Sequence, residues 1–333
     1  AILAPNPHNR QPWLIELGDD VDTLTLYCDR QRLLPHTDPQ NRQITIGLGA
    51  FLELFRQAAA QQGYIAQITP FPDGEPHPHL DERKIAQIRL QASPIAKPDP
   101  LFGHALARRT VRKKFDTSRP LAPADFSRLA TEAKLSKENT FATTLDAEKI
   151  ERLKTLCRDG WVVETSTPDT HHESTALTRI GATEVAANPD GISLFGPSME
   201  LYKSLGVLTR AKMNETGSRA QKGALSFYNG LIDTAVAFGW LSTPRNSRGD
   251  QLRAGADWVR LNLAATKLGM AMHPLSQVLQ EFPEMAELYT EFHAEVGMSE
   301  PARVQGLFRF GYAKYPKAAP RWPLESRLVN MEK

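Results

Sequence analysis

A run of cations between positions 108 and 115 is the segment best suited to chemistry with a charged ligand. It reads Arg108-Arg109-Thr110-Val111-Arg112-Lys113-Lys114-Phe115. If the run opens a helix, Arg108 and Arg112 share one face, and such pairs repel by roughly 0.2–0.5 kcal/mol unless an anion lies between them. Two guanidinium forks, the Thr110 hydroxyl and the N–H groups of a first helical turn would hold a phosphate well. The run therefore predicts a phosphate cradle.

A solvated basic face or a nucleic-acid-binding patch is the common alternative for such a run. The composition argues against nucleic acid, because 40 Lys and Arg residues stand against 38 Asp and Glu residues, for a net charge of +2. No second basic stripe occurs along the chain. We therefore expect no nucleic-acid partner and keep that alternative as a third hypothesis.

The opening segment, Ala4-Pro5-Asn6-Pro7-His8-Asn9-Arg10-Gln11-Pro12-Trp13, is rich in prolines and amides. The prolines fix φ and restrict the residues before them, so the amides have little conformational freedom. An amide offers a donor and an acceptor together, which matches the mixed edge of a flavin's pyrimidine ring and the hydroxyls of its ribityl chain. An ordinary turn before a strand is the alternative. Together with the cation run, the segment predicts a phosphate-bearing flavin.

These two segments resemble the two signatures of the FMN-dependent nitroreductase-like superfamily, P-S-x-x-N-x-Q-P-W and R-R-S-x-R-x-F. Here the Q-P-W signature comes first, and that order resembles the Acg-type branch, in which one chain carries two nitroreductase-like halves. Two later segments, 307–312 and 320–324, resemble the last strand and the C-terminal phosphate arm of that branch. The resemblance implies an α+β nitroreductase-like fold, with helices packed on antiparallel or mixed sheets and a pseudo-dimer within one chain.

The resemblance also implies a set of FMN-binding residues. They are Pro5, Asn6, Pro7, His8, Asn9, Gln11, Arg108, Arg109, Thr110, Arg112, Pro274, Leu275, Ser276, Gln277 and Arg321. In this family Arg108 and Arg321 would hold the phosphate, and Arg112 would lie near flavin N1 and the C2 oxygen. The backbone around Ser276 and Gln277 would donate an N–H toward flavin N5. No catalytic side chain is expected, because the flavin performs the chemistry, and no metal site is expected.

The organisation of the chain follows from the same comparison. We expect residues 1–93 to form a degenerate first half and residues 101–333 a second half, joined by a linker over 94–100 that contains three prolines. Residues 188–221 mix glycines with apolar side chains and fit either a lid over the flavin or two surface helices with a loop. Because the second half has no Q-P-W signature of its own, one flavin site per chain is expected.

Hydrophobic periodicity indicates the main elements. Alternation predicts a hairpin of strands over 13–17 and 23–28, with further strands over 64–69 and 84–90. A period of 3.6 residues predicts helices over 48–62, 123–134, 147–158 and 248–271. No apolar run approaches the roughly 20 residues that a membrane-spanning helix needs.

Two functions from different classes fit these features. The first is an FMN-dependent oxidoreductase that passes hydride from NAD(P)H to flavin N5 and on to a nitroaromatic, quinone or similar planar acceptor. The second is an FMN-binding protein whose lid shields the flavin, with little turnover and a role in flavin storage. The sequence leaves the location open between two alternatives: cytoplasmic, or periplasmic if a removed twin-arginine signal preceded Ala1.

Overall fold

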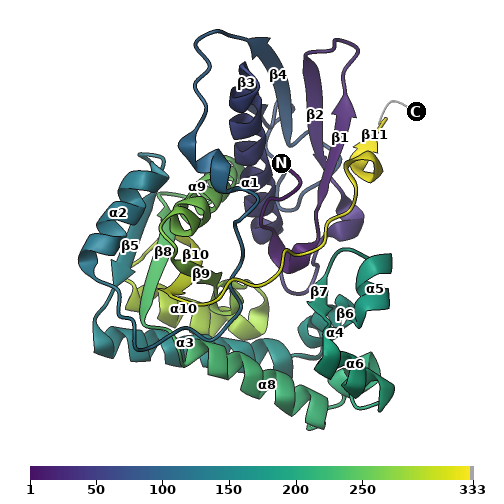
Figure 1. Ribbon diagram of the computed structural model, residues 1–333, viewed down its shortest axis with the longest axis vertical. Helices are drawn as coiled ribbons and strands as arrows, with labels where there is room; N and C mark the ends of the chain where they lie inside the picture. Colours follow the sequence, from purple (N-terminus) through teal and green to yellow (C-terminus); the bar gives the residue numbers. More distant parts are fainter. Residues whose placement is uncertain (331–333) are drawn as a thin grey trace.

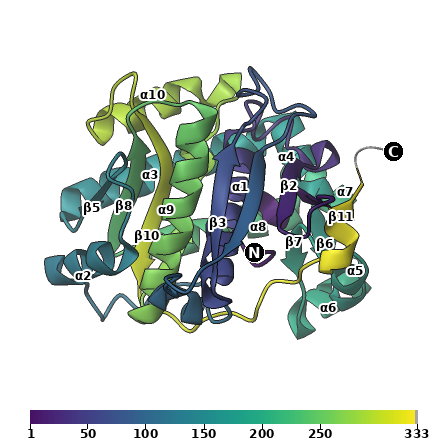
Figure 2. The same ribbon diagram turned by 90° about the horizontal axis from the view of Figure 1, so that it is seen from above.

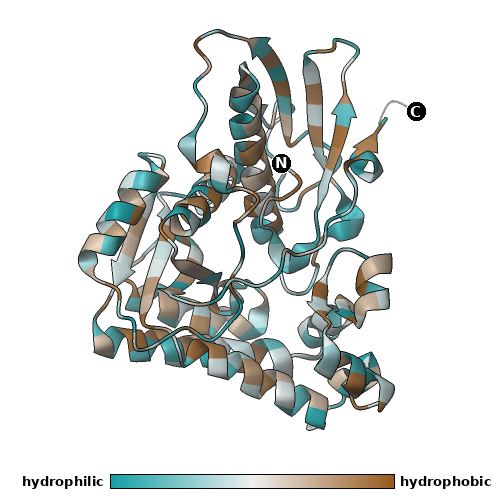
Figure 3. Ribbon diagram, in the orientation of Figure 1, coloured by the Kyte–Doolittle hydropathy of each residue, from teal (hydrophilic) through white to brown (hydrophobic). Residues whose placement is uncertain are grey.

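The computed structural model describes residues 1–330 and contains two main sheets, each built from a different part of the chain (Figure 1). The first sheet has the strand order β11-β1-β2-β4-β3. Its strands are β1 (Trp13–Leu17), β2 (Thr23–Cys28), β3 (Tyr64–Pro70), β4 (Ala86–Ala92) and β11 (Leu328–Val329). β1 and β2 pair antiparallel, as predicted for the hairpin. Alternating hydropathy along these strands is visible in Figure 3 and fits a sheet with one packed face.

The second sheet has the order β5-β8-β10-β9 and is antiparallel throughout. Its strands are β5 (Thr140–Thr144), β8 (Ala237–Thr243), β9 (Ala271–Pro274) and β10 (Arg303–Gly311). After β10 the chain returns to the first sheet, where β11 pairs parallel with β1. Helices packed on one mixed and one antiparallel sheet confirm the predicted α+β class.

Two long helices, α1 (Arg42–Gln61) and α9 (Arg248–Lys267), lie between the two sheets (Figure 2). A Cβ atom placed on Gly49 would lie 2.0 Å from the carbonyl oxygen of Leu252, and one placed on Gly255 would lie 1.9 Å from that of Ile46. Each glycine therefore allows the backbone of one helix to touch the other. This close crossing joins the two halves of the chain.

Buried ion pairs reinforce that junction. Arg42, at the start of α1, donates to Glu281 at 2.9 Å and to Gln305 at 3.1 Å. Arg260 of α9 donates to Glu53 and Asp99, both at 2.7 Å. Each guanidinium finds its acceptors on a distant part of the chain, so these charges link early and late parts of the sequence.

The remaining helices form two groups (Figure 1). Four helices lie beside the second sheet: α2 (Pro123–Ala133), α3 (Ala147–Ser166), α8 (Arg219–Ile232) and α10 (Ala286–Glu295). A smaller group contains α4 (Pro168–Ala176), α5 (Ala182–Ala187), α6 (Pro197–Ser204), α7 (Arg210–Asn214) and the parallel strands β6 (Thr178–Ile180) and β7 (Ile192–Leu194). Short 3₁₀ helices are η1 (Pro7–Asn9), η2 (Arg30–Arg32), η3 (Pro100–His104), η4 (Gln277–Leu279), η5 (Pro283–Met285) and η6 (Leu324–Arg327). In the described residues, no helix has the length and apolar character needed to span a membrane.

The predicted helix over the cation run is wrong, because residues 108–115 form neither helix nor strand. Three long-range bonds hold this segment open against the second sheet. The Val111 N–H donates to the Met272 carbonyl at 3.1 Å, and the Phe115 N–H donates to the Thr234 hydroxyl at 3.0 Å. Arg309 donates to the Lys113 carbonyl at 2.6 Å. The proposed cradle of first-turn N–H groups therefore does not exist, although the cations do converge on other partners.

Helix boundaries differ from the predictions in three places. α1 begins at Arg42 rather than at residue 48, because the Asp38 carboxylate accepts bonds from the N–H groups of Gln43 and Ile44 at 3.0 and 2.9 Å. α9 ends at Lys267 rather than at residue 271, because Gly269 takes a φ of +68° and turns the chain into β9. α3 continues beyond residue 158 to Ser166.

Candidate functional site

The opening loop has an unusual backbone. His8, Asn9 and Gln11 have φ values of 46°, 51° and 53°, in the left-handed region that non-glycine residues rarely adopt. Each such residue costs on the order of 1–3 kcal/mol, and strain of this kind concentrates at ligand sites. The Asn6 side-chain oxygen accepts the Gln11 N–H at 2.7 Å and holds the loop in this shape.

Three guanidinium groups from two separate segments, Arg108 and Arg109 from one and Arg321 from the other, meet beside this loop. Arg108 donates to the Leu3 carbonyl and to the Asn262 side-chain oxygen, both at 2.9 Å. Arg321 donates to the Ile2 carbonyl at 2.9 Å. Arg109 donates to carbonyl oxygens only, among them that of Leu106 at 2.7 Å. Within residues 1–330, none of these three guanidinium groups forms an ion pair with a carboxylate.

We call Arg108, Arg109 and Arg321 the anion cluster, because they would attract an anion and none of them has a carboxylate counter-charge among residues 1–330. Burial, together with the charges of Arg321 and Arg109, lowers the pKa of Arg108 to about 9. Burial and the charge of Arg109 lower the pKa of Arg321 to about 10. The buried Nε atom of Arg108 has no acceptor among the described residues. The donor set therefore fits a phosphate or another multiply charged anion, which would supply the missing acceptors.

A second positive focus is Arg112, whose side chain is exposed. Its guanidinium has no hydrogen bond or ion pair in the described part of the chain. Burial lowers the pKa of His8 to about 4, and the nearby charge of Arg112 contributes. The pKa of His273 lies well below its ordinary value because of burial and the charges of Arg309 and Arg112. Arg112 therefore faces both the opening loop and β9, and both histidines are neutral at physiological pH.

The segment after β9 provides donors near Arg112. The Leu275 N–H is used in a bond to the Leu307 carbonyl at 2.9 Å. The next two backbone N–H groups, of Ser276 and Gln277, have no acceptor among residues 1–330. The Tyr228 hydroxyl of α8 donates to the Gln277 side-chain oxygen at 2.9 Å and fixes that side chain. Pro274 is the last residue of β9, so these donors follow directly on the strand.

The amides of the opening loop divide into two groups. The Gln11 side chain donates to the Pro189 carbonyl at 2.8 Å and accepts the Trp322 N–H at 2.9 Å, so it ties other segments to the loop. The Asn9 amide donates to the Pro320 carbonyl at 3.1 Å. In contrast, the Asn9 side-chain oxygen and the His8 Nδ1 are buried without a partner in the described chain. These two atoms are the ones left for a ligand.

The sequence-predicted site residues therefore come together from four parts of the chain. The loop with Pro5, Asn6 and Pro7 lies against the start of α1, since a Cβ on Gly47 would lie 2.9 Å from the Asn6 Cβ. Thr110 is half-buried. It lies between Arg109 and Val111, whose N–H donates to the Met272 carbonyl. Their contacts with FMN remain predictions. Sequence reasoning missed Asn262 and Tyr228; a lone asparagine between Leu261 and Leu263 in a helix was the available signal for the first.

The chain is similar to proteins that are named as nitroreductases, which agrees with the resemblance seen in its sequence. It is 27% identical to the protein Rv3127 of Mycobacterium tuberculosis, over 98% of this chain and 90% of that protein. It is 25% identical to a second protein of Mycobacterium tuberculosis, provisionally named NAD(P)H nitroreductase acg, over 98% of this chain and 92% of that protein.

A solved structure is also similar in fold. It is the FMN-dependent nitroreductase NfnB from Mycobacterium smegmatis in complex with NADPH, with a TM-score of 0.40 and 17% identity, covering 66% of this chain and 93% of that one. No family model matches the chain.

Proposed function

We propose that the chain binds FMN between its opening loop and the anion cluster and acts as an NAD(P)H-dependent oxidoreductase of the nitroreductase type. The observation that carries the proposal is the set of three guanidinium groups, Arg108, Arg109 and Arg321, held together with no carboxylate partner in the described part of the chain. A phosphate group would turn their mutual repulsion into charge-assisted hydrogen bonds. The relatives named as nitroreductases support the redox chemistry.

Bound FMN would supply the hydride chemistry, and the protein residues would bind and orient it. The anion cluster would hold the phosphate at one end of the site. The Asn9 side-chain oxygen and the His8 Nδ1, both free of protein partners in the described residues, would accept or donate to the ribityl chain or ring edge. Arg112 would favour negative charge on the flavin ring. The N–H groups of Ser276 and Gln277 would lie toward the reactive edge of that ring.

The second candidate is flavin storage with little turnover, and one feature favours it. The segment that follows Pro189 is bonded directly to the opening loop, since the Gly191 N–H donates to the Asn9 carbonyl at 3.4 Å. A segment tied down in this way would restrict access of a nicotinamide or a planar acceptor to the ring. Binding residues would be the same in both cases, so only turnover separates them.

The test is visible absorbance of the purified protein supplied with FMN under nitrogen. A bound flavin band that NADPH bleaches, and that a nitroaromatic or quinone restores, supports the oxidoreductase. A band that NADPH leaves intact but dithionite removes supports storage. Absence of bound flavin contradicts both candidates. We expect one FMN per chain, so a ratio near two would show that the pseudo-symmetric site is also functional.

A further inference from the structure

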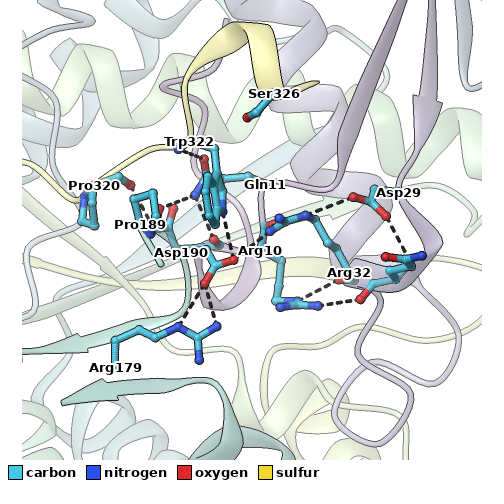
Figure 4. A network of polar contacts seen from close by, with 12 residues as sticks. Arg10, Gln11, Asp29, Arg32, Arg179, Pro189, Asp190, Pro320, Trp322 and Ser326 are labelled. Carbon is cyan, nitrogen blue, oxygen red and sulfur yellow. Dashed lines mark hydrogen bonds and ion pairs between the residues drawn. The ribbon is translucent and has the colours of Figure 1, made fainter. Parts of the chain in front are cut away.

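Asp190 lies where three separate parts of the chain meet (Figure 4). Its carboxylate accepts from Arg32 of η2 at 2.8 Å, from Arg179 of β6 at 2.7 Å and from the Trp322 indole N–H at 3.0 Å. The side chain is only 6% exposed, so these bonds form away from bulk water. Burial disfavours its ionisation, but the hydrogen bonds from Trp322, Arg179 and Arg32 outweigh burial and hold the pKa of Asp190 below its ordinary value. Asp190 is therefore an ionised anchor with both oxygens in use.

The Trp322 contact matters because Trp322 directly follows Arg321 of the anion cluster. Residues 312–323 form neither helix nor strand, so no ladder of backbone bonds fixes this arm. Trp322 is instead held at two points, its backbone N–H by Gln11 at 2.9 Å and its indole N–H by Asp190. The Arg321 guanidinium itself donates to the carbonyl oxygens of Ile2, Leu3 and Ala4. The Trp322 bonds add a second anchor, which fixes the arm that carries Arg321 beside Arg108.

The Arg32 contact connects Asp190 to the opening loop. Arg32 donates to the Arg10 carbonyl at 3.0 Å, and Arg10 donates back to the Arg32 carbonyl at 3.0 Å. Arg10 and Gln11 are adjacent, and the Gln11 amide donates to the Pro189 carbonyl, next to Asp190. Asp190 thus joins the C-terminal arm, the opening loop and the β6 region through bonds that all lie outside the anion cluster.

We propose that Asp190 is a positioning residue for phosphate recognition: it fixes Trp322, and through it Arg321, against the opening loop, without contacting the ligand. The proposal rests on the proposed function, because it concerns the same site. It makes a specific claim about selectivity. Since the flavin ring and the phosphate would be held by different groups, loss of Asp190 should affect recognition of the phosphate and spare recognition of the ring.

The experiment compares FMN with riboflavin, which lacks the phosphate, by quenching of flavin fluorescence on binding. For Asp190→Asn, which keeps the shape but not the charge, we expect FMN affinity to fall at least tenfold and riboflavin affinity to stay within twofold of the parent. Equal losses for both flavins would show a general structural defect and overturn the proposal. An unchanged affinity for FMN would overturn it as well.

Glu53→Gln is the matched control. Glu53 is also 6% exposed and ion-paired with two arginines, Arg56 and Arg260, but it lies on α1 away from the arm. It should leave the ratio of the two affinities unchanged. Trp322→Phe removes only the indole donor to Asp190 and should shift the ratio in the same direction, so the proposal stays testable if Asp190→Asn does not fold. A Trp322→Phe protein with the parent's ratio would overturn it.

Two further measurements separate this proposal from the proposed function. If the parent binds neither flavin, the proposed function fails, and titration with inorganic phosphate decides the role of Asp190: tenfold weaker binding by Asp190→Asn supports it, and equal or absent binding overturns it. Hydrogen–deuterium exchange of the ligand-free proteins should show faster exchange over residues 312–323 in Asp190→Asn than in Glu53→Gln. Equal exchange there would contradict the proposed link to the arm.

Discussion

The guanidinium groups of Arg108 and Arg321 converge on one acceptor, the backbone carbonyl oxygen of Leu3, at 2.9 and 3.5 Å. One arginine begins the cation run at residue 108, and the other belongs to the C-terminal arm. Burial, followed by the charges of Arg321 and Arg109, lowers the pKa of Arg108, and a neutral carbonyl acceptor does not offset these effects. The protein thus assembles an incomplete electrostatic unit that an anion would complete.

The first prediction concerns Arg108→Ala. A hydrogen bond to a charged group contributes roughly 1.5–3 kcal/mol, so FMN affinity should fall by about ten- to a hundredfold. The free energy of unfolding of the ligand-free protein should change less, because the substitution also removes a repulsive charge. Fluorescence titration and urea unfolding measure the two effects.

Arg119→Ala serves as the control for that experiment, because Arg119 is exposed and stacks on the Tyr312 ring at 3.9 Å. It should leave FMN affinity unchanged. If Arg108→Ala bound FMN as tightly as Arg119→Ala does, the anion cluster would not be the phosphate site.

The second prediction concerns the crossing of α1 and α9. Gly255→Ala should lower the free energy of unfolding by roughly 1–3 kcal/mol or more, because the new methyl group would overlap the Ile46 carbonyl oxygen. Gly223→Ala in α8 is the matched control, since nothing lies within 4 Å of its added Cβ. It should raise stability by up to about 1 kcal/mol, as alanine is the better helix former. Urea unfolding measures both, and equal effects would refute the close crossing.

The third prediction is a pH dependence of stability from Glu164, a buried carboxyl of α3. Burial raises its pKa from the ordinary 4.5 to about 7, and the bond from Ser174 offsets burial only in part. Between these two pH values the folded protein holds a proton that the unfolded chain has released. Stability should therefore fall as pH rises from about 4.5 to about 7 and level off above.

Glu164→Gln should make the free energy of unfolding fall less steeply with pH than in the parent, by the contribution of one titrating group. Urea unfolding between about pH 5 and about pH 8 measures this. Asp38, whose pKa burial also raises to about 7, should keep contributing in the same direction. A variant with the full slope of the parent would show that Glu164 does not titrate in this range.

The sequence predicted what depends on local pattern. The hairpin of β1 and β2 follows from alternation and a short polar turn, and both strands have the expected bounds. The helix predicted for the cation run is wrong, because the shape of this segment is set by Met272, Thr234 and Arg309, all remote in sequence. Local propensity carries no information about such partners.

The same limit applies to the site. Proline and amide content indicated a rigid opening loop. In the structure the Gln11 side-chain amide donates to Pro189 and accepts from Trp322, so it is not free for a ligand. Asp190 has no signature in the sequence, because a single aspartate in a polar loop is ordinary. Its importance arises only where β6, η2 and the C-terminal arm meet.

The last prediction concerns Tyr228, which is buried with its ring 4.5 Å from that of Trp161 and its hydroxyl bonded to Gln277. Tyr228→Phe keeps the ring packing and removes from the Gln277 side chain one hydrogen bond, worth about 0.5–1.5 kcal/mol. If the N–H of Gln277 lies at the reactive edge of the flavin, the rate of flavin reduction by NADPH should fall about two- to tenfold, with FMN affinity within twofold of the parent. Anaerobic stopped-flow absorbance gives the rate.

Tyr289→Phe is the control for Tyr228→Phe, since the buried Tyr289 hydroxyl on α10 has no partner among the described residues and its loss should leave the rate unchanged. A Tyr228→Phe protein that matched it in rate would place the reactive edge away from Gln277.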